Sequence, residues 1–223
     1  MWNQTNLWES LAEKKNSGEL CSQRVEKYRE ILMERVLIDP VEKILKFGSF
    51  FQLARKSPRG NLQNFSVATD LFCRQPHPIN KLNYFTMSPG EGPCIRNTFQ
   101  LHPITSTTST QNASGGNQNQ NIKFNQDFMI QCMGWKFEPL FLLALPQMPQ
   151  ISEINDIQLS RKEDHPISYF RWKFIYPDPE MRLEMEDENV PYNAHVLLVH
   201  SATNRLATNQ KISTRTLFGK KIM

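Results

Sequence analysis

Cysteines are scarce in this sequence of 223 residues. The four that are present lie far apart and form no C-x-x-C pair, which argues against a zinc knuckle and against a disulfide scaffold. They are Cys21, Cys73, Cys94 and Cys132. Cysteine usage of this kind is typical of a reducing compartment, so we expect a cytoplasmic protein.

Long hydrophobic runs are absent as well. No stretch reaches the roughly 18 apolar residues of a membrane helix. Residues 1–5 are polar where a secretory signal would be apolar. We therefore expect neither secretion nor a membrane partner.

Catalytic and cofactor motifs are also missing. The sequence contains no H-E-x-x-H pair, no phosphate-binding G-x-x-x-x-G-K-[ST] or G-x-G-x-x-G loop and no G-x-S-x-G motif. His195 and His200 stand an odd number of positions apart in one expected strand, so their side chains face opposite sides and cannot share a metal. We expect no enzyme activity, no cofactor and no metal site.

The charge is nearly balanced. Lys and Arg number 26 and Asp and Glu 22, which gives a net charge of +4. Nucleic-acid binders usually concentrate positive charge, whereas here it is dispersed. We expect no nucleic-acid partner, and we interpret the acidic stretch 184–188 as a solvated turn.

A short pattern occurs three times, at residues 47–53, 124–130 and 192–198. Each copy is an aromatic residue, a Gly or Asn that can adopt a positive φ, two mostly polar residues, and an apolar-x-apolar strand start. The copies lie about 70 residues apart, and a turn with a second apolar segment follows each. A closed barrel removes the unpaired edges that single hairpins would leave. The repeat therefore predicts a mainly β protein with a β-trefoil-like body over residues 41–223.

Residues 1–40 form a separate helical segment in this interpretation. Leu7 and Leu11 share one face of a first helix, and Gly18 is a candidate stop. Apolar residues spaced by three and four then form one stripe of a second helix: Cys21, Val25, Tyr28, Leu32 and Val36. We expect Leu11, Val25, Tyr28 and Leu32 to face the body, with an arm for a partner as the alternative. Trp2 and Trp8 are large apolar residues on a terminal segment, which favours anchoring on a neighbour.

Short strands and turns fill the rest of the chain. The expected strands are 50–54, 64–68, 98–101, 128–132, 140–144, 170–175, 181–185 and 194–200. Residues 105–121 are almost all Ser, Thr, Gln, Asn and Gly, so we expect a disordered surface loop there.

Aromatic residues offer one alternative function, because a trefoil can bind sugars by stacking. The candidates are Trp135, Phe137, Phe141, Phe170 and Trp172. Alternation of Phe170, Trp172 and Phe174 on one face favours the barrel core instead.

Ordered phrases along nearly the whole chain carry a family resemblance. They are Trp2-Asn3, Arg96-Asn97-Thr98-Phe99, Gln126-Asp127-Phe128, Pro177-Asp178-Pro179, Arg182-Leu183-Glu184, Val190-Pro191, Asn193-Ala194, Thr203-Asn204-Arg205, Leu206-Ala207 and Phe218-Gly219-Lys220. In this order they resemble the cilia- and flagella-associated protein 161 family. The third repeat also looks like a MIR-type trefoil lobe, through Val196, Leu198, His200, Thr203 and Leu206.

The resemblance implies a structural microtubule inner protein that binds the luminal wall of axonemal doublet microtubules, in the A-tubule, and supports ciliary motility. Its expected partners are tubulin and neighbouring inner proteins, and its expected location is the cilium. The residues singled out as partner contacts are Trp2, Trp8, Arg96, Asn97, Asp178 and Arg182. The alternative is a cytosolic trefoil module that binds carbohydrate or protein ligands. A third lobe without its closing strands would leave an open sheet edge, which a partner is expected to cover.

Overall fold

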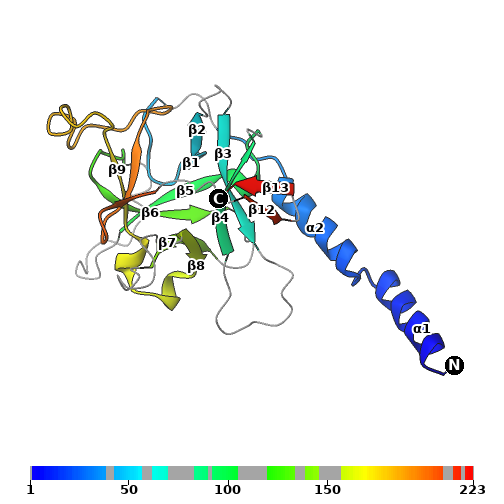
Figure 1. Cartoon of the computed structure of the whole chain (residues 1–223). Helices are drawn as coiled ribbons and strands as arrows, with labels where there is room; N and C mark the ends of the chain where they lie inside the picture. Colours follow the sequence, from blue (N-terminus) through cyan, green and yellow to red (C-terminus); the bar gives the residue numbers. More distant parts are fainter. Residues whose placement is uncertain are drawn as a thin grey trace.

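Two helices and a β body make up the protein, as the computed structural model in Figure 1 shows. The structure describes residues 2–38, 43–56, 62–69, 83–89, 92–104, 120–133, 139–145, 157–207, 213–216 and 219–222. The expected boundary at Pro40, most of the expected disordered loop, Trp135 and Phe137 lie outside these ranges. Gln120 and Asn121, the last two residues of that loop, are paired with Phe47 and Lys46 in the β body.

Helices α1 (Trp2–Asn16) and α2 (Cys21–Met33) follow one another at the N-terminus. Gly18 separates them with a φ of 72°, and the Glu19 N–H donates to the Lys14 carbonyl across it. A left-handed residue here satisfies a carbonyl of the last helical turn, so the predicted stop is confirmed.

The helices form an arm that projects from the body (Figure 1). Its base is fixed by the Val36 N–H, which donates to the Pro93 carbonyl, and by the Ile95 N–H, which donates to the Glu34 carbonyl. Leu32 is buried, as expected. Leu11 is exposed, so its expected inward position is wrong, because α1 lies beyond the reach of the body. The side chains of Val25 and Tyr28 lie outside the described residues.

Thirteen strands and three short 3-10 helices are described after the arm. The strands are β1 (Phe50–Phe51), β2 (Ala54–Lys56), β3 (Leu62–Thr69), β4 (Asn83–Pro89), β5 (Phe99–Pro103), β6 (Asp127–Cys132), β7 (Leu140–Ala144), β8 (Ile157–Ser160), β9 (Trp172–Ile175), β10 (Leu197–His200), β11 (Arg205–Leu206), β12 (Ser213–Thr216) and β13 (Gly219–Ile222). The 3-10 helices are η1 (Ile95–Asn97), η2 (Lys162–Asp164) and η3 (Ile167–Phe170).

Antiparallel pairing joins these strands into a barrel with a hairpin cap. In the barrel, β5 lies between β1 and β6, and β9 lies between β6 and β10. In the cap, β3 pairs with β4, β7 with β8 and β12 with β13, while β4 also pairs with β8 and β13. The strand-and-hairpin unit is thus repeated along the chain.

A ring of three backbone hydrogen bonds marks the centre of the repeat. The Leu45 N–H donates to the Val190 carbonyl (2.9 Å), Val190 donates to Ile122 (2.8 Å), and Ile122 donates back to Leu45 (2.8 Å). All three side chains are buried. A closed cycle of this kind relates the three segments by a pseudo-threefold axis, as the repeated pattern predicted.

The turns after this ring are equivalent too. Gly48, Asn125 and Asn193 have φ values of 84°, 62° and 63°. They occupy the same position in the three copies of the pattern, where a residue tolerant of the left-handed region was predicted. The sequence pattern therefore sets the same backbone turn in each lobe.

One strand prediction is wrong, and another strand begins later than expected. Residues 181–185 form turns, with the Met185 N–H donating to the Met181 carbonyl, although apolar residues alternate there. Leu183 is 83% exposed, and residues 181–185 pair with none of the described strands, so alternation alone cannot make a strand. Phe170 belongs to η3 rather than to β9. Most of the other expected strands are present, and β10 begins at Leu197 rather than at Ala194.

Candidate interaction surface

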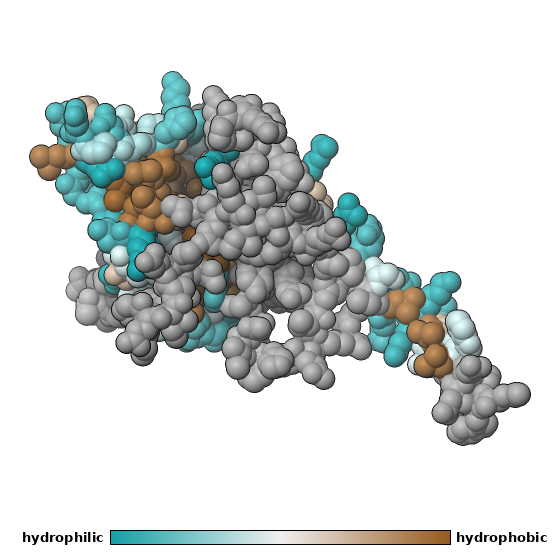
Figure 2. Space-filling model, in the orientation of Figure 1, coloured by the Kyte–Doolittle hydropathy of each residue, from teal (hydrophilic) through white to brown (hydrophobic). Residues whose placement is uncertain are grey.

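The arm carries large apolar side chains that are exposed. Leu7 is 60% exposed and Trp8 70% exposed, and Leu11 follows one turn later on the same side of α1. Figure 2 shows brown, apolar residues exposed along the arm. The side chain of Trp2 lies outside the described residues. Apolar residues at this spacing are the kind that anchor a helix in a partner's groove.

Arg96 and Asn97 lie in the interior of the protein. Arg96 is 2% and Asn97 0% exposed. Asn97 is a structural residue, because its Oδ1 accepts from the Cys94 N–H (2.8 Å) and its Nδ2 donates to the Gly92 carbonyl (3.2 Å). Their expected role as partner contacts is therefore contradicted by burial, which the sequence phrase alone did not reveal.

Asp178 and Arg182 lie on the surface, in the exposed loop 176–188. The Asp178 Oδ1 accepts from the Glu180 N–H (3.1 Å), and the Arg182 guanidinium donates to the carbonyls of Tyr176 (3.0 Å) and Pro177 (3.2 Å). Both residues shape the loop from within. Their contact with a partner stays a prediction.

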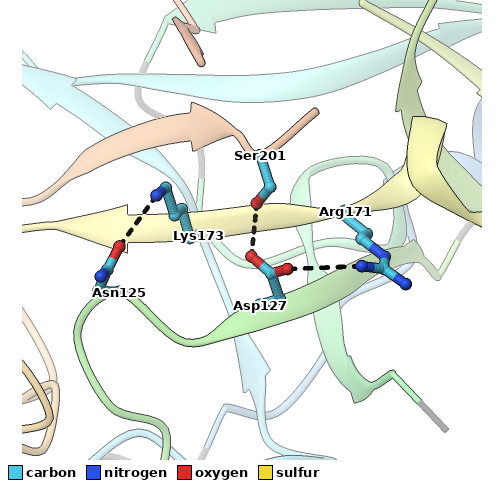
Figure 3. A network of polar contacts seen from close by, with 5 residues as sticks. All are labelled: Asn125, Asp127, Arg171, Lys173 and Ser201. Atoms are coloured by element: carbon cyan, nitrogen blue, oxygen red, sulfur yellow. Dashed lines mark hydrogen bonds and ion pairs between the residues drawn. The ribbon is translucent and has the colours of Figure 1, made fainter. Parts of the chain in front are cut away.

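A polar network joins the second and third lobes (Figure 3). The Ser201 Oγ donates to the Asp127 Oδ1 (2.6 Å), and the Arg171 Nη1 lies 4.0 Å from the Asp127 Oδ2. Beside it, the Lys173 Nζ donates to the Asn125 Oδ1 (2.9 Å). These contacts hold β6, β9 and the turn after β10 together, so the network positions the lobes.

His200 has a structural role in the third lobe. Its Nε2 donates to the Tyr169 carbonyl (3.1 Å), and its Nδ1 accepts from the Thr203 hydroxyl (2.9 Å). Burial lowers the pKa of His200, and the hydrogen bond to Tyr169 partly offsets that effect. A neutral imidazole satisfies both partners, which fixes the turn after β10.

The aromatic residues considered as a sugar platform are in the core wherever they are described. Phe170 and Trp172 are buried, and the Trp172 Nε1 donates to the Leu142 carbonyl (2.9 Å). Phe141 is buried against Phe170. The predicted core role of Phe170, Trp172 and Phe174 is confirmed by their burial, and Phe141 lies in the core as well.

The described part of the chain contains no group of three or more His, Cys, Asp or Glu residues placed to hold a metal ion. In the same ranges, no helix has both the length and the apolar character needed to cross a membrane.

Two solved structures share this fold. The crystal structure of the SDF2-like protein from Arabidopsis thaliana matches with a TM-score of 0.55 and 13% identity, and the match covers 80% of this chain and 86% of that chain. A structure from Caenorhabditis elegans, of a protein with unknown function, matches with a TM-score of 0.54 and 11% identity over 82% and 89% of the two chains. The body is accordingly a MIR-like, β-trefoil-like domain, and the predicted fold class is confirmed.

The sequence pattern of the cilia- and flagella-associated protein 161-like domain matches residues 24–163 and 151–223. The chain therefore belongs to that family. The cilia- and flagella-associated protein 161 of Danio rerio is 24% identical over 207 residues, which cover 86% of this chain and 65% of that protein. The Bos taurus protein of the same name is 24% identical over 219 residues, covering 93% and 66%. The chain thus spans about two thirds of the length of these relatives.

Proposed function

We propose that this protein is a structural component of ciliary doublet microtubules, bound to the luminal wall of the A-tubule through tubulin and neighbouring inner proteins. Family membership supports an association with cilia and flagella. The observation that carries the finer proposal is the projecting arm with exposed Leu7, Trp8 and Leu11. A body of this size offers a limited face, and an arm extends its reach to a second site.

Binding by several modest contacts explains how such a protein can act as a structural component without catalysing a reaction. A standard interface buries about 800 Å² per partner. Two or more smaller contacts in a periodic lattice reinforce one another through effective concentration, so each can be weak. The net charge of +4 helps retention on an acidic lattice only modestly, because salt screens exposed charges. The protein stabilises the doublet by bridging lattice sites.

Fractionation of cilia tests the proposal. The tagged protein is expressed in ciliated cells, the membrane is removed with detergent, and the doublets are washed with moderate salt. We expect the protein to stay with the doublets, and tomography to place its density on the inner wall of the A-tubule. Release by mild salt, or density on the outer wall, would contradict the luminal bridge.

The arm is tested with a double variant, Leu7→Ala with Trp8→Ala. Each anchor of this type contributes about 2 kcal/mol to an interface. We expect the variant to fold normally and to be retained far less in washed doublets. Leu37→Ala is the matched control, because Leu37 is 94% exposed and lies beyond the two helices of the arm. Equal retention of both variants would show that the arm does not contribute to binding the doublet.

A second candidate function is a cytosolic trefoil module for a protein ligand. Half-buried apolar residues packed against the core favour a protein ligand, and the burial of Phe170 and Trp172 disfavours a carbohydrate. The same fractionation separates the two candidates. A binding module would leave with the detergent-soluble fraction, and the doublet protein would remain in the pellet.

A further inference from the structure

Exposed large apolar side chains are concentrated in one loop of the body. From Lys43 onward, the described residues include three of them: Met181 (38% exposed), Leu183 (83%) and Leu206 (49%). The first two belong to loop 176–188. This loop projects as a yellow-orange trace on the side of the body away from the arm in Figure 1, and Figure 2 shows brown, apolar atoms among teal residues there. Apolar surface that polar residues surround is typical of a contact with another protein.

Both ends of this loop are fixed to the second lobe. At its end, the Phe124 N–H donates to the Glu188 carbonyl (2.9 Å). At its start, the Tyr176 ring packs edge-on against the Phe124 ring, with 5.6 Å between the ring centroids. Phe124 itself is only 2% exposed. One core residue therefore holds the loop at its two ends.

Contacts inside the loop hold its outermost apolar side chain away from the body. The Arg182 guanidinium donates to the Tyr176 carbonyl (3.0 Å), and the Met185 N–H donates to the Met181 carbonyl (3.0 Å). The Met185 side chain is half-buried against the core. Leu183 lies between Arg182 and Met185 in the chain and is left in solvent. An anchor that is already fixed loses little conformational entropy on binding, so more of its contact energy contributes to affinity.

The loop is strongly acidic, although the whole chain has a net charge of +4. Six negative charges against the one positive charge of Arg182 give residues 176–188 a net charge of −5. Within the described residues, none of these carboxylates forms an ion pair, and no metal-binding group of three or more is present. The six residues are all exposed: Asp178, Glu180, Glu184, Glu186, Asp187 and Glu188.

We propose that loop 176–188 docks on a partner protein whose surface is basic and surrounds an apolar pocket. Leu183 fills the pocket, with Met181 at its edge, and the carboxylates face Lys and Arg side chains of the partner. The apolar anchor supplies most of the affinity, as a few central side chains do in protein interfaces. The surrounding charge accelerates association and selects the partner.

Charge also decides between the possible occupants. A membrane surface is disfavoured, because its anionic headgroups repel a loop with a net charge of −5. A second copy of this chain is disfavoured, because positive charge is dispersed along its sequence and matches no such concentration of carboxylates. The inference goes beyond the proposed function and holds for a partner inside or outside a doublet.

A basic peptide tests the charge of the surface with the 223-residue protein. The probe is the fluorescein-labelled peptide KKLKKLKK with blocked ends, and we expect saturable binding by anisotropy with a Kd below about 1 mM at low salt. The loop variant is Glu184→Gln with Asp187→Asn and Glu188→Gln. Asparagine is suitable at position 187 because it tolerates the φ of 66° found there. This variant should bind the peptide at least about tenfold more weakly.

The matched control removes the same charge from exposed residues of the arm, by Glu9→Gln with Glu13→Gln and Glu19→Gln. It should weaken binding by less than about twofold, since exposed charges far from the contact are screened. Equal weakening by the two triple variants would mean diffuse attraction to the whole protein and would overturn the proposal, as would absence of saturable binding.

The apolar anchor is tested with the same peptide. Leu183→Ser should weaken binding at least about fivefold, because the leucines of the peptide lose their contact. Leu206→Ser is the control, since Leu206 is also exposed but belongs to β11. Equal affinity of the wild type and Leu183→Ser would exclude an apolar anchor and overturn the proposal.

Site-specific cross-linking identifies the partner in ciliated cells. A photoreactive benzoylphenylalanine replaces Leu183 in the tagged protein, and the cross-linked peptides are sequenced by mass spectrometry. We expect a basic segment of another protein, which the same photoreactive residue at position 206 does not capture. An acidic segment, a segment of this chain or no cross-link would overturn the proposal. Any of these failures would leave retention of the protein on doublets through the arm unchanged, so this inference and the proposed function fail separately.

Discussion

The three residues of the central hydrogen-bonded ring provide a quantitative test of the pseudo-threefold core. Ile122 is 0% exposed. Replacing it with alanine removes three buried carbons, a transfer loss of about 2.4 kcal/mol at about 0.8 kcal/mol each. The cavity adds to this loss, because the hydrogen-bonded backbone of the ring cannot move in to fill it. Ile122→Ala should therefore lower the free energy of unfolding by about 3–4 kcal/mol.

Val190→Ala removes one carbon fewer and should cost about 2 kcal/mol. Urea unfolding followed by the fluorescence of buried Trp172 and by circular dichroism gives both values. Leu183→Ala on the exposed loop is the control and should change stability by less than about 0.5 kcal/mol. A cost below about 1 kcal/mol for Ile122→Ala would refute the reasoning, since the ring would then not be the centre of one core.

Three further predictions concern single side chains. Asn97→Ala should lower the free energy of unfolding by about 1–3 kcal/mol in urea titrations, because it leaves the buried Cys94 N–H without its acceptor. Burial lowers the pKa of His200 and of His102 below 6.5, so the unfolded chain takes up protons that the folded chain resists. The melting temperature should therefore fall as pH drops below about 6.5 and change little above that pH. This dependence of the melting temperature on pH should be weaker in His200→Gln. An unchanged dependence would exclude His200 as a cause. Trp8→Ala should leave the melting temperature unchanged, and a clear decrease would mean that the arm packs on the body after all.

Local sequence set the turns of the repeat. Gly48, Asn125 and Asn193 were predicted to adopt a positive φ, and they do. The reason is short-range, because only a few residue types tolerate that conformation and an apolar-x-apolar segment follows each of them. The start of β1 at Phe50 was predicted for the same reason, and that of β6 to within one residue.

Other strands depend on partners that are distant in sequence. Residues 181–185 alternate like a strand but form turns, and none of the strands in the described ranges pairs with them. Strand β4 was not predicted, although it pairs with β3, β8 and β13. A strand is stabilised by its neighbours, so its own sequence is an incomplete guide.

The residues expected to contact a partner show the same difference between local sequence and tertiary structure. The sequence alone determined the family and the threefold repeat, because these depend on residue order and local spacing. Only the tertiary structure decided that Arg96 and Asn97 are buried and that α1 projects. Burial depends on how the whole chain closes around a residue, and closure here follows from pairing between strands far apart in the sequence.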